Sequence, residues 1–141
     1  MSNAIAGYGT LLKRGDGGAP EVFSLIGEVK SISGPTLDVK EADVTTHSSA
    51  AAGAYMEFVA TLIDPGTVDF EINYVPTDVT HQGLRNDMLG RVKRNFKLIT
   101  PGAQDTISFT AFVKKGVYEF PTADVIKQKI SLRITGAPVW T

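Results

Sequence analysis

The 141-residue sequence predicts one mostly β domain, an antiparallel sandwich or barrel with a single α-helix and a long projecting loop. The segment 68–74, VDFEINY, alternates apolar and polar residues without interruption, which is typical of a strand with one buried face. Turn-forming glycine and proline residues separate further short apolar runs along the chain. The stretch 41–54 is small, polar and rich in alanine, serine and threonine, so we expect the long loop there.

The first half of the chain contains most of the expected turns. We expect strands over 8–13, 21–33, 36–40 and 55–63. The last of these is largely apolar and could be a strand or a helix, and we favour extended structure. The alternation fails at Leu25-Ile26, which indicates a bulge or burial on both faces. A flexible glycine-rich turn is expected over 14–20, where the Arg-Gly-Asp tripeptide is interpreted as incidental, and a type II turn at 64–66.

The expected helix covers residues 77–92. Candidates for its N-cap are Thr77, Asp78 and Thr80. An apolar stripe that should pack on the sheet consists of Leu84, Met88, Leu89 and Val92. Gly90 is expected at the left-handed position that ends the helix.

After the helix, alternation predicts strands over 95–100, 106–113, 117–120 and 126–135. The sequence Lys114-Lys115-Gly116 is expected to form a turn between the second and third of these strands. Residues from Gly136 onward are expected to form a tail.

The residues that could carry chemistry are few and scattered. Without cysteine, the chain cannot form disulfides, thiol catalysts or cysteine-based zinc sites. His47 lies beside Ser48 and Ser49 in the loop, and His81 lies in the first helical turn, where we expect it to be solvated. Neither histidine has the spacing of a metal site or a catalytic triad, so we expect no enzyme, no cofactor and no metal.

The charge pattern argues against a dedicated nucleic-acid binder. The net charge is −1, whereas such proteins usually carry a basic excess. The basic cluster consists of Arg85, Arg91, Lys93, Arg94 and Lys97, with Phe96 among them. It is interpreted as a solvated helix end, with a stacking groove for single strands or a salt-bridged subunit contact as alternatives. No apolar run is long enough to cross a bilayer and no signal peptide is visible, so we expect no membrane partner.

Several short motifs, in this order, resemble the tail tube (major tail) proteins of long-tailed, non-contractile bacteriophages. The pieces are SISGP at 31–35, DVT at 43–45, GAYMEF at 53–58, DPGTV at 64–68 and the closing KISLRITGAPVW. The resemblance touches most of the chain and implies a structural subunit. Such subunits form six-fold rings that stack into a hollow tube, through which DNA passes without specific binding.

The resemblance also implies partners and a location. These are other copies of the chain, a tape-measure protein, and terminator and tail tip proteins, in a virion tail assembled in the host cytoplasm. The loop is expected to contact the next subunit or ring through Glu41, Asp43, Val44, Thr45, Thr46, His47, Ser48, Ser49 and Tyr55. The polar face of VDFEINY supplies candidate lumen-facing residues, Asp69, Glu71 and Asn73, for which an ordinary solvated outer face is the alternative.

The alternative from another functional class is a small β-barrel that binds a sugar or single-stranded nucleic acid. Such a module needs a groove lined by aromatic side chains. The chain has few aromatic residues, and Phe70, Tyr74 and Phe109 fall at alternating positions expected in the core.

Overall fold

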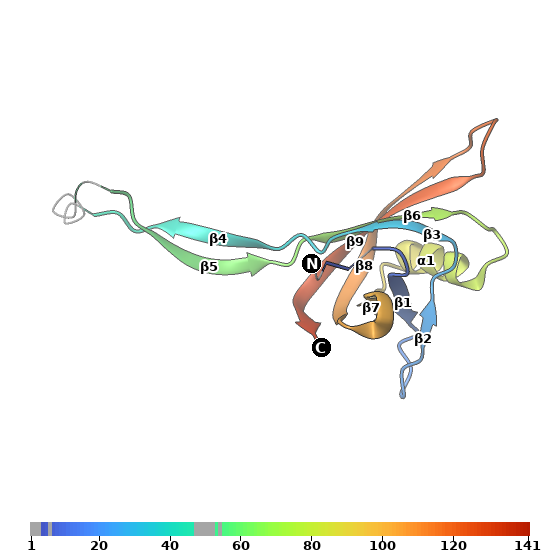
Figure 1. The fold of residues 1–141 in the computed structure, drawn as a ribbon, viewed down its shortest axis with the longest axis horizontal. Coiled ribbons are helices and arrows are strands. Elements are labelled where there is room, and N and C mark those ends of the chain that lie inside the picture. Colours follow the sequence, from blue (N-terminus) through green and yellow to red (C-terminus); the bar gives the residue numbers. More distant parts are fainter. Residues whose placement is uncertain (1–3, 6, 47–52, 54) are drawn as a thin grey trace.

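A seven-stranded antiparallel sheet forms the body, and a separate two-stranded hairpin projects from it in the computed structural model (Figure 1). The structure describes residues 4–5, 7–46, 53 and 55–141. The sheet order is β2-β1-β7-β8-β9-β6-β3. The strands are β1 Leu11–Gly15, β2 Phe23–Leu25, β3 Val29–Ser33, β4 Asp38–Asp43, β5 Phe58–Asp64, β6 Thr67–Asn73, β7 Lys93–Ile99, β8 Thr106–Glu119 and β9 Lys127–Trp140. The α-helix among the described residues is α1, Val79–Gly90, and a short 3-10 turn, Pro101–Ala103, precedes β8.

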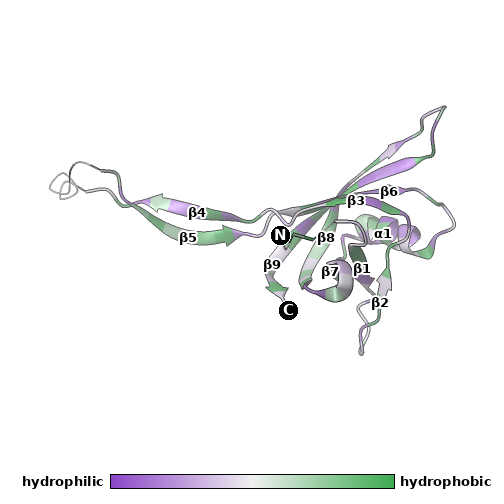
Figure 2. Ribbon diagram, in the orientation of Figure 1, coloured by the Kyte–Doolittle hydropathy of each residue, from purple (hydrophilic) through white to green (hydrophobic). Residues whose placement is uncertain are grey.

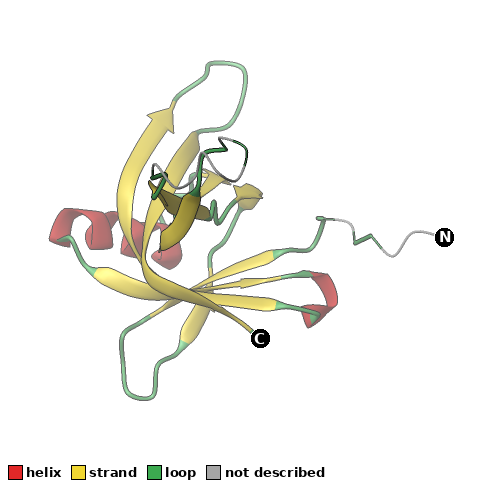
Figure 3. Cartoon of the chain, turned by 90° about the vertical axis from the view of Figure 1, so that its left-hand side faces the viewer, coloured by secondary structure: helices red, strands yellow, loops and turns green. Residues whose placement is uncertain are grey.

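The sheet folds over on itself into a partly closed barrel. Viewed from the side of the hairpin, the strands of its two halves cross, and α1 lies beside them (Figure 3). The connection between β2 and β3 joins the two edges of the sheet. The Ile26 N–H donates to the Leu12 carbonyl of β1 at 3.0 Å, and the Asn73 N–H of β6 donates to the Glu28 carbonyl at 2.9 Å. The predicted fold class, mostly antiparallel β with one helix, is therefore confirmed.

Alternating residues of the long strands fill the core. Val68, Phe70 and Ile72 of β6 are buried, as the alternation of VDFEINY predicts. The other buried apolar residues are Leu12, Ile26, Leu84, Phe96, Leu98, Phe109, Ala111, Val113, Ile130, Leu132 and Ile134. Burial of apolar surface contributes about 25 cal/mol per Å² to folding, so this cluster dominates the stability of the body.

The expected strand over 21–33 is wrong, because the chain turns within it. Strand β2 ends at Leu25, and β3 begins at Val29 on the opposite edge of the sheet. Glu28 adopts a left-handed conformation with φ 62°, which completes the turn. The failed alternation at Leu25-Ile26 therefore marks a change of strand, with Ile26 buried at the crossing point.

The expected turn at 114–116 and the expected tail are also wrong. Strand β8 continues through these residues, and the ladder with β9 shifts register between Val113 and Lys115 as a β-bulge. The tail pairs as well, since Val139 and Trp140 lie opposite Ser108 and Ile107. A bulge keeps a long strand paired while it bends, so local turn residues need not end it.

The expected loop is largely a hairpin, which we call the arm and define as residues 37–46 and 55–64. Strand β4 extends to Asp43, so the first part of the stretch 41–54 is strand. Strand β5 confirms that the apolar run 55–63 is extended. The arm follows β3 and precedes β6 in the chain but forms a separate ladder, and the expected turn at 64–66 lies between β5 and β6 (Figure 1). There the Asp64 carboxylate accepts a hydrogen bond from the Gly66 N–H at 2.9 Å, and Gly66 has φ 74°.

The helix begins as expected and ends differently. The Asp78 side chain caps it by accepting a hydrogen bond from the Thr80 N–H at 2.8 Å. At the other end the left-handed residue is Arg91, with φ 54°, and not Gly90.

The buried face of α1 differs from the expected stripe. Leu84 is buried, whereas 38% of Met88 and 70% of Leu89 are exposed. His81, expected in solvent, is 1% exposed. The Val75 N–H donates to His81 Nδ1 at 3.1 Å, so Nε2 carries the proton that is shared with the Gly27 carbonyl at 2.7 Å. Both ring nitrogens of the buried His81 are hydrogen-bonded, and the side chain joins the helix to two loops of the body.

Candidate assembly surfaces

The arm exposes apolar side chains that it cannot bury by itself. Every residue of β4 is exposed, and β5 is exposed up to its last residue. Figure 2 shows that β5 is largely apolar. The exposed large apolar residues of the arm are Leu37, Val39, Val44, Tyr55, Met56, Phe58, Val59, Leu62 and Ile63. An isolated two-stranded hairpin is marginally stable in water, and so many exposed large apolar side chains on one hairpin make it a candidate interaction site.

Acidic residues accompany the apolar residues of the arm. Two of the carboxylates are paired, Asp38 with Lys40 at 2.8 Å and Asp64 with Arg133 at 2.9 Å. Glu41 and Glu57 form no ion pair with any described residue. Hydrogen bonds from the Thr45 side chain and backbone lower the pKa of the Asp43 carboxyl below its usual value, so it stays charged at neutral pH.

Of the predicted contact residues, Glu41 and Asp43 lie in β4, and Val44, Thr45, Thr46 and Tyr55 lie between the strands and the tip. Hydrogen bonds extend the hairpin past β4, from the Val44 N–H to the Glu57 carbonyl at 2.9 Å and from the Glu57 N–H to Thr45 Oγ1 at 2.8 Å. The predicted contact residues His47, Ser48 and Ser49 lie outside the described residues. The prediction missed the apolar side chains of β5, although the largely apolar run 55–63 signals them.

The candidate lumen residues lie on the face of β6 that points away from the core of the subunit. Asp69 is exposed and accepts a hydrogen bond from Ser131 Oγ at 2.5 Å, while Glu71 and Asn73 lie opposite Lys129 and Lys127 of β9. A shallow groove of about 450 Å³ includes Asp69 and Glu71 together with lysine side chains. This face therefore carries both positive and negative charges. The sequence of β6 alone suggests a more acidic face than the one the structure shows.

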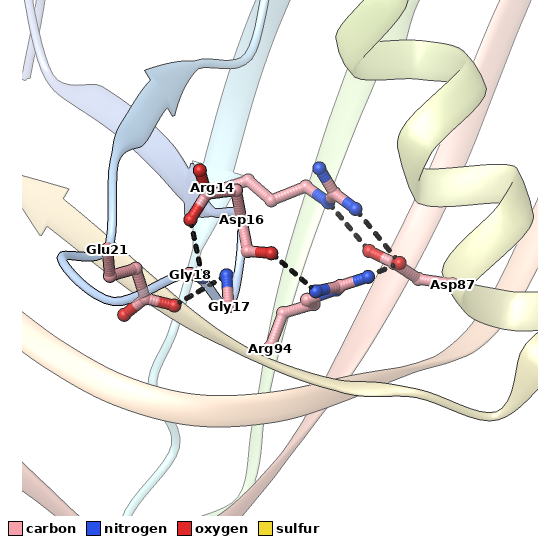
Figure 4. Close-up of polar contacts among 7 residues, drawn as sticks. All are labelled: Arg14, Asp16, Gly17, Gly18, Glu21, Asp87 and Arg94. Atoms are coloured by element: carbon pink, nitrogen blue, oxygen red, sulfur yellow. Dashed lines mark hydrogen bonds and ion pairs between the residues drawn. The ribbon is translucent and has the colours of Figure 1, made fainter.

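Arg94 of the basic cluster already pairs with groups inside the subunit. The buried Asp87 carboxylate of α1 accepts hydrogen bonds from Arg14 Nε at 2.6 Å, Arg14 Nη2 at 2.9 Å and Arg94 Nε at 3.1 Å (Figure 4). Arg94 also donates to the Asp16 carbonyl at 2.8 Å. Arg14 of the Arg-Gly-Asp tripeptide is thus committed to an internal contact, in agreement with its incidental interpretation.

The aromatic residues near the basic cluster do not offer a stacking surface. Phe96 is 1% exposed and stacks on Phe109 inside the core. Lys97 lies over the Phe23 ring at 4.2 Å from its centroid. Phe23, Phe96 and Phe109 line a small hollow of about 270 Å³, but Phe96 and Phe109 expose almost no ring surface on which a base could stack.

The described residues hold neither a metal-binding cluster nor a membrane-spanning helix. They contain no group of three or more histidine, aspartate or glutamate side chains placed to hold a metal ion. None of their helices is long and apolar enough to span a bilayer.

The arrangement of a folded-over sheet, a lateral helix and a projecting hairpin defines a known class of fold, that of tail tube proteins. The chain is similar to a subunit in the tail of an empty gene transfer agent particle, refined helically with C6 symmetry. The TM-score is 0.78 at 16% identity, over 98% of this chain and 99% of that chain. It is also similar to the SPP1 tail tube protein, with a TM-score of 0.71 at 11% identity, over 98% of this chain and 79% of that chain.

The same fold occurs in a contractile particle. A chain in the sheath/tube terminator of an extracellular contractile injection system (PVC) has a TM-score of 0.75 at 14% identity, over 100% of this chain and 99% of that chain. No protein-family model and no curated protein sequence matches the chain. At these identities the likeness establishes the fold, and the predicted resemblance to tail tube proteins is confirmed at that level.

Proposed function

We propose that this chain is the structural subunit of a phage tail tube and that its copies form six-fold rings stacked around a channel for DNA. The observation that carries the proposal is the arm, whose apolar side chains have no cover within the subunit. Another copy of the chain provides that cover in an assembled tube. The C6 symmetry of the gene transfer agent tail supports six copies per ring.

The proposal includes location and partners. The subunit belongs to a virion tail assembled in the host cytoplasm, with a tape-measure protein in the channel and terminator and tail tip proteins at the ends. The similarity to a chain in a sheath/tube terminator complex supports a tube that is closed by a further protein. Because solved neighbours include a contractile system, the non-contractile type of tail stays a prediction. The proposed subunit has a structural role and no enzymatic one.

The arm provides the first test. We expect the double variant Leu62→Thr and Ile63→Thr to leave the subunit folded, because both side chains are exposed on a strand that threonine also favours. Removing their apolar surface should prevent tube formation. The measurement is to concentrate parent and variant in identical buffer and to count tubes by electron microscopy.

The matched control for the arm is Val22→Thr with Val79→Thr, two exposed valines outside it. This control should assemble like the parent. If the arm variant polymerises as readily as the parent and the control, the arm does not hold copies together and the proposal loses its main support.

The lumen assignment has its own test. If Asp69 and Glu71 face the channel, replacing both with lysine adds positive charge that attracts DNA phosphates. We expect tails with these changes to assemble but to eject DNA slowly and to lose infectivity. The control Asp69→Asn with Glu71→Gln removes the charges without adding positive ones and should eject DNA normally. Unimpaired infectivity of the lysine variant would place this face on the outside.

A further inference from the structure

An apolar groove runs between α1 and β8 on the body of the subunit. It consists of two adjoining hollows of about 290 and 480 Å³, both of which Met88 and Val113 line. Leu84 and Leu89 of the helix line the first hollow, and Phe112 of β8 lines the second. Met88 and Leu89 are thus exposed because their side chains border an open groove.

The charged residues that line this groove are all cations. They are Arg85, Arg91, Lys93 and Lys114. Each is exposed, and none forms an ion pair with a described residue. The nearby carboxylate of Asp87 does not compensate them, since it is buried against Arg14 and Arg94. The groove therefore has an apolar floor and a basic rim.

The arm has the complementary character. Its exposed apolar side chains lie among the carboxylates of Glu41, Asp43 and Glu57, which have no cationic partner among the described residues. We infer that the groove between α1 and β8 receives the arm of a second copy, with apolar side chains on the floor and carboxylates against the rim. This inference rests on the proposed function and assigns the acceptor surface to it.

The shape of the subunit makes this contact intermolecular. The arm extends from one side of the body, and α1 lies on the opposite side (Figure 1). The arm of one copy therefore cannot fill its own groove, and it fills that of a neighbour instead. A contact between two different surfaces is heterologous, and repeating it generates a closed ring or an open helical array.

Charge reversal tests the pairing. The groove variant is Arg91→Glu with Lys93→Glu, and the arm variant is Glu41→Lys with Glu57→Lys. Each places like charges together in the contact, so each should raise the protein concentration needed for assembly about tenfold or more. A chain with all four changes restores opposite charges and should assemble close to the parent concentration. Assembly is measured by sedimentation velocity and microscopy at low salt.

The control for charge reversal is Lys13→Glu with Lys30→Glu, which reverses two lysines that do not line the groove. It should assemble like the parent. If the groove variant and the control behave alike, or if the four changes together give no rescue, the groove is not the acceptor. In that case a failure of Leu62→Thr with Ile63→Thr to assemble would still support the arm as an assembly element.

Cross-linking gives an independent test that does not depend on charge. Because the chain has no cysteine, Leu62→Cys on one copy and Leu89→Cys on another introduce the only thiols. A flexible bis-maleimide should join these two copies in a mixture, whereas Val22→Cys with Leu89→Cys should give little product. Equal cross-linking of both pairs, or none of the arm–groove pair, would overturn the inference.

Discussion

Replacing Asp87 with alanine should lower the free energy of unfolding by about 3 kcal/mol. The Asp87 carboxylate is buried and holds Arg14 of β1 and Arg94 of β7 against α1. Its loss leaves two guanidiniums without their anion. The expected cost lies at the lower end for a broken buried ion pair, because both arginines retain partial contact with water. Urea titration followed by circular dichroism measures the change.

An exposed ion pair supplies the control for Asp87. Asp124 pairs with Lys127 at 2.7 Å, and half of the Asp124 side chain is exposed. Asp124→Ala should therefore cost about 0–1 kcal/mol. If the two variants unfold at the same urea concentration, the Arg14–Asp87–Arg94 cluster does not hold the helix to the sheet as its geometry indicates.

Leu84→Ala should lower the free energy of unfolding by about 2–5 kcal/mol, a large share of the roughly 5–15 kcal/mol typical of a domain. Leu84 is 2% exposed and belongs to the core, so its truncation leaves a cavity. Leu89 on the same helix is 70% exposed, and Leu89→Ala leaves none. We therefore expect a clear drop in melting temperature for Leu84→Ala and little change for Leu89→Ala in the isolated subunit.

Tube assembly, unlike the stability of the isolated subunit, should depend on Leu89. Leu89 lines the groove, so Leu89→Ala should weaken association even though the subunit keeps its stability. A large loss of monomer stability from Leu89→Ala would mean that the helix packs with a different face on the sheet.

Sequence patterns predicted the elements whose side chains alternate between two environments. VDFEINY and the last strand each present one face to the core, and Val68, Ile72, Leu132 and their neighbours are buried accordingly. The patterns failed where tertiary contacts override local signals. The segment at Leu25-Ile26 changes sheet edge, and β8 passes through a glycine turn signal because a bulge preserves its pairing.

The candidate site was predictable only in part. The sequence showed the projecting region around 41–54 and the apolar run beside it, because each is a continuous stretch of residues. The basic groove was not, since it brings Arg91 of the helix end next to Phe112 and Lys114 of a distant strand. Likewise, no local pattern predicts that His81 is buried, because its two hydrogen-bond partners come from separate loops.

The short connection from the arm into β6 also determines how the subunit carries mechanical load. Strand β5 of the arm is joined to β6 by the two-residue turn Pro65-Gly66, and β6 pairs along its whole length with β9. Tension applied along the arm therefore reaches β6 and strains the hydrogen bonds of the β6–β9 ladder together, in shear. Peeling would break the same bonds one after another at a lower force. A tube whose copies grip one another by such arms resists stretching along the direction in which the arms point.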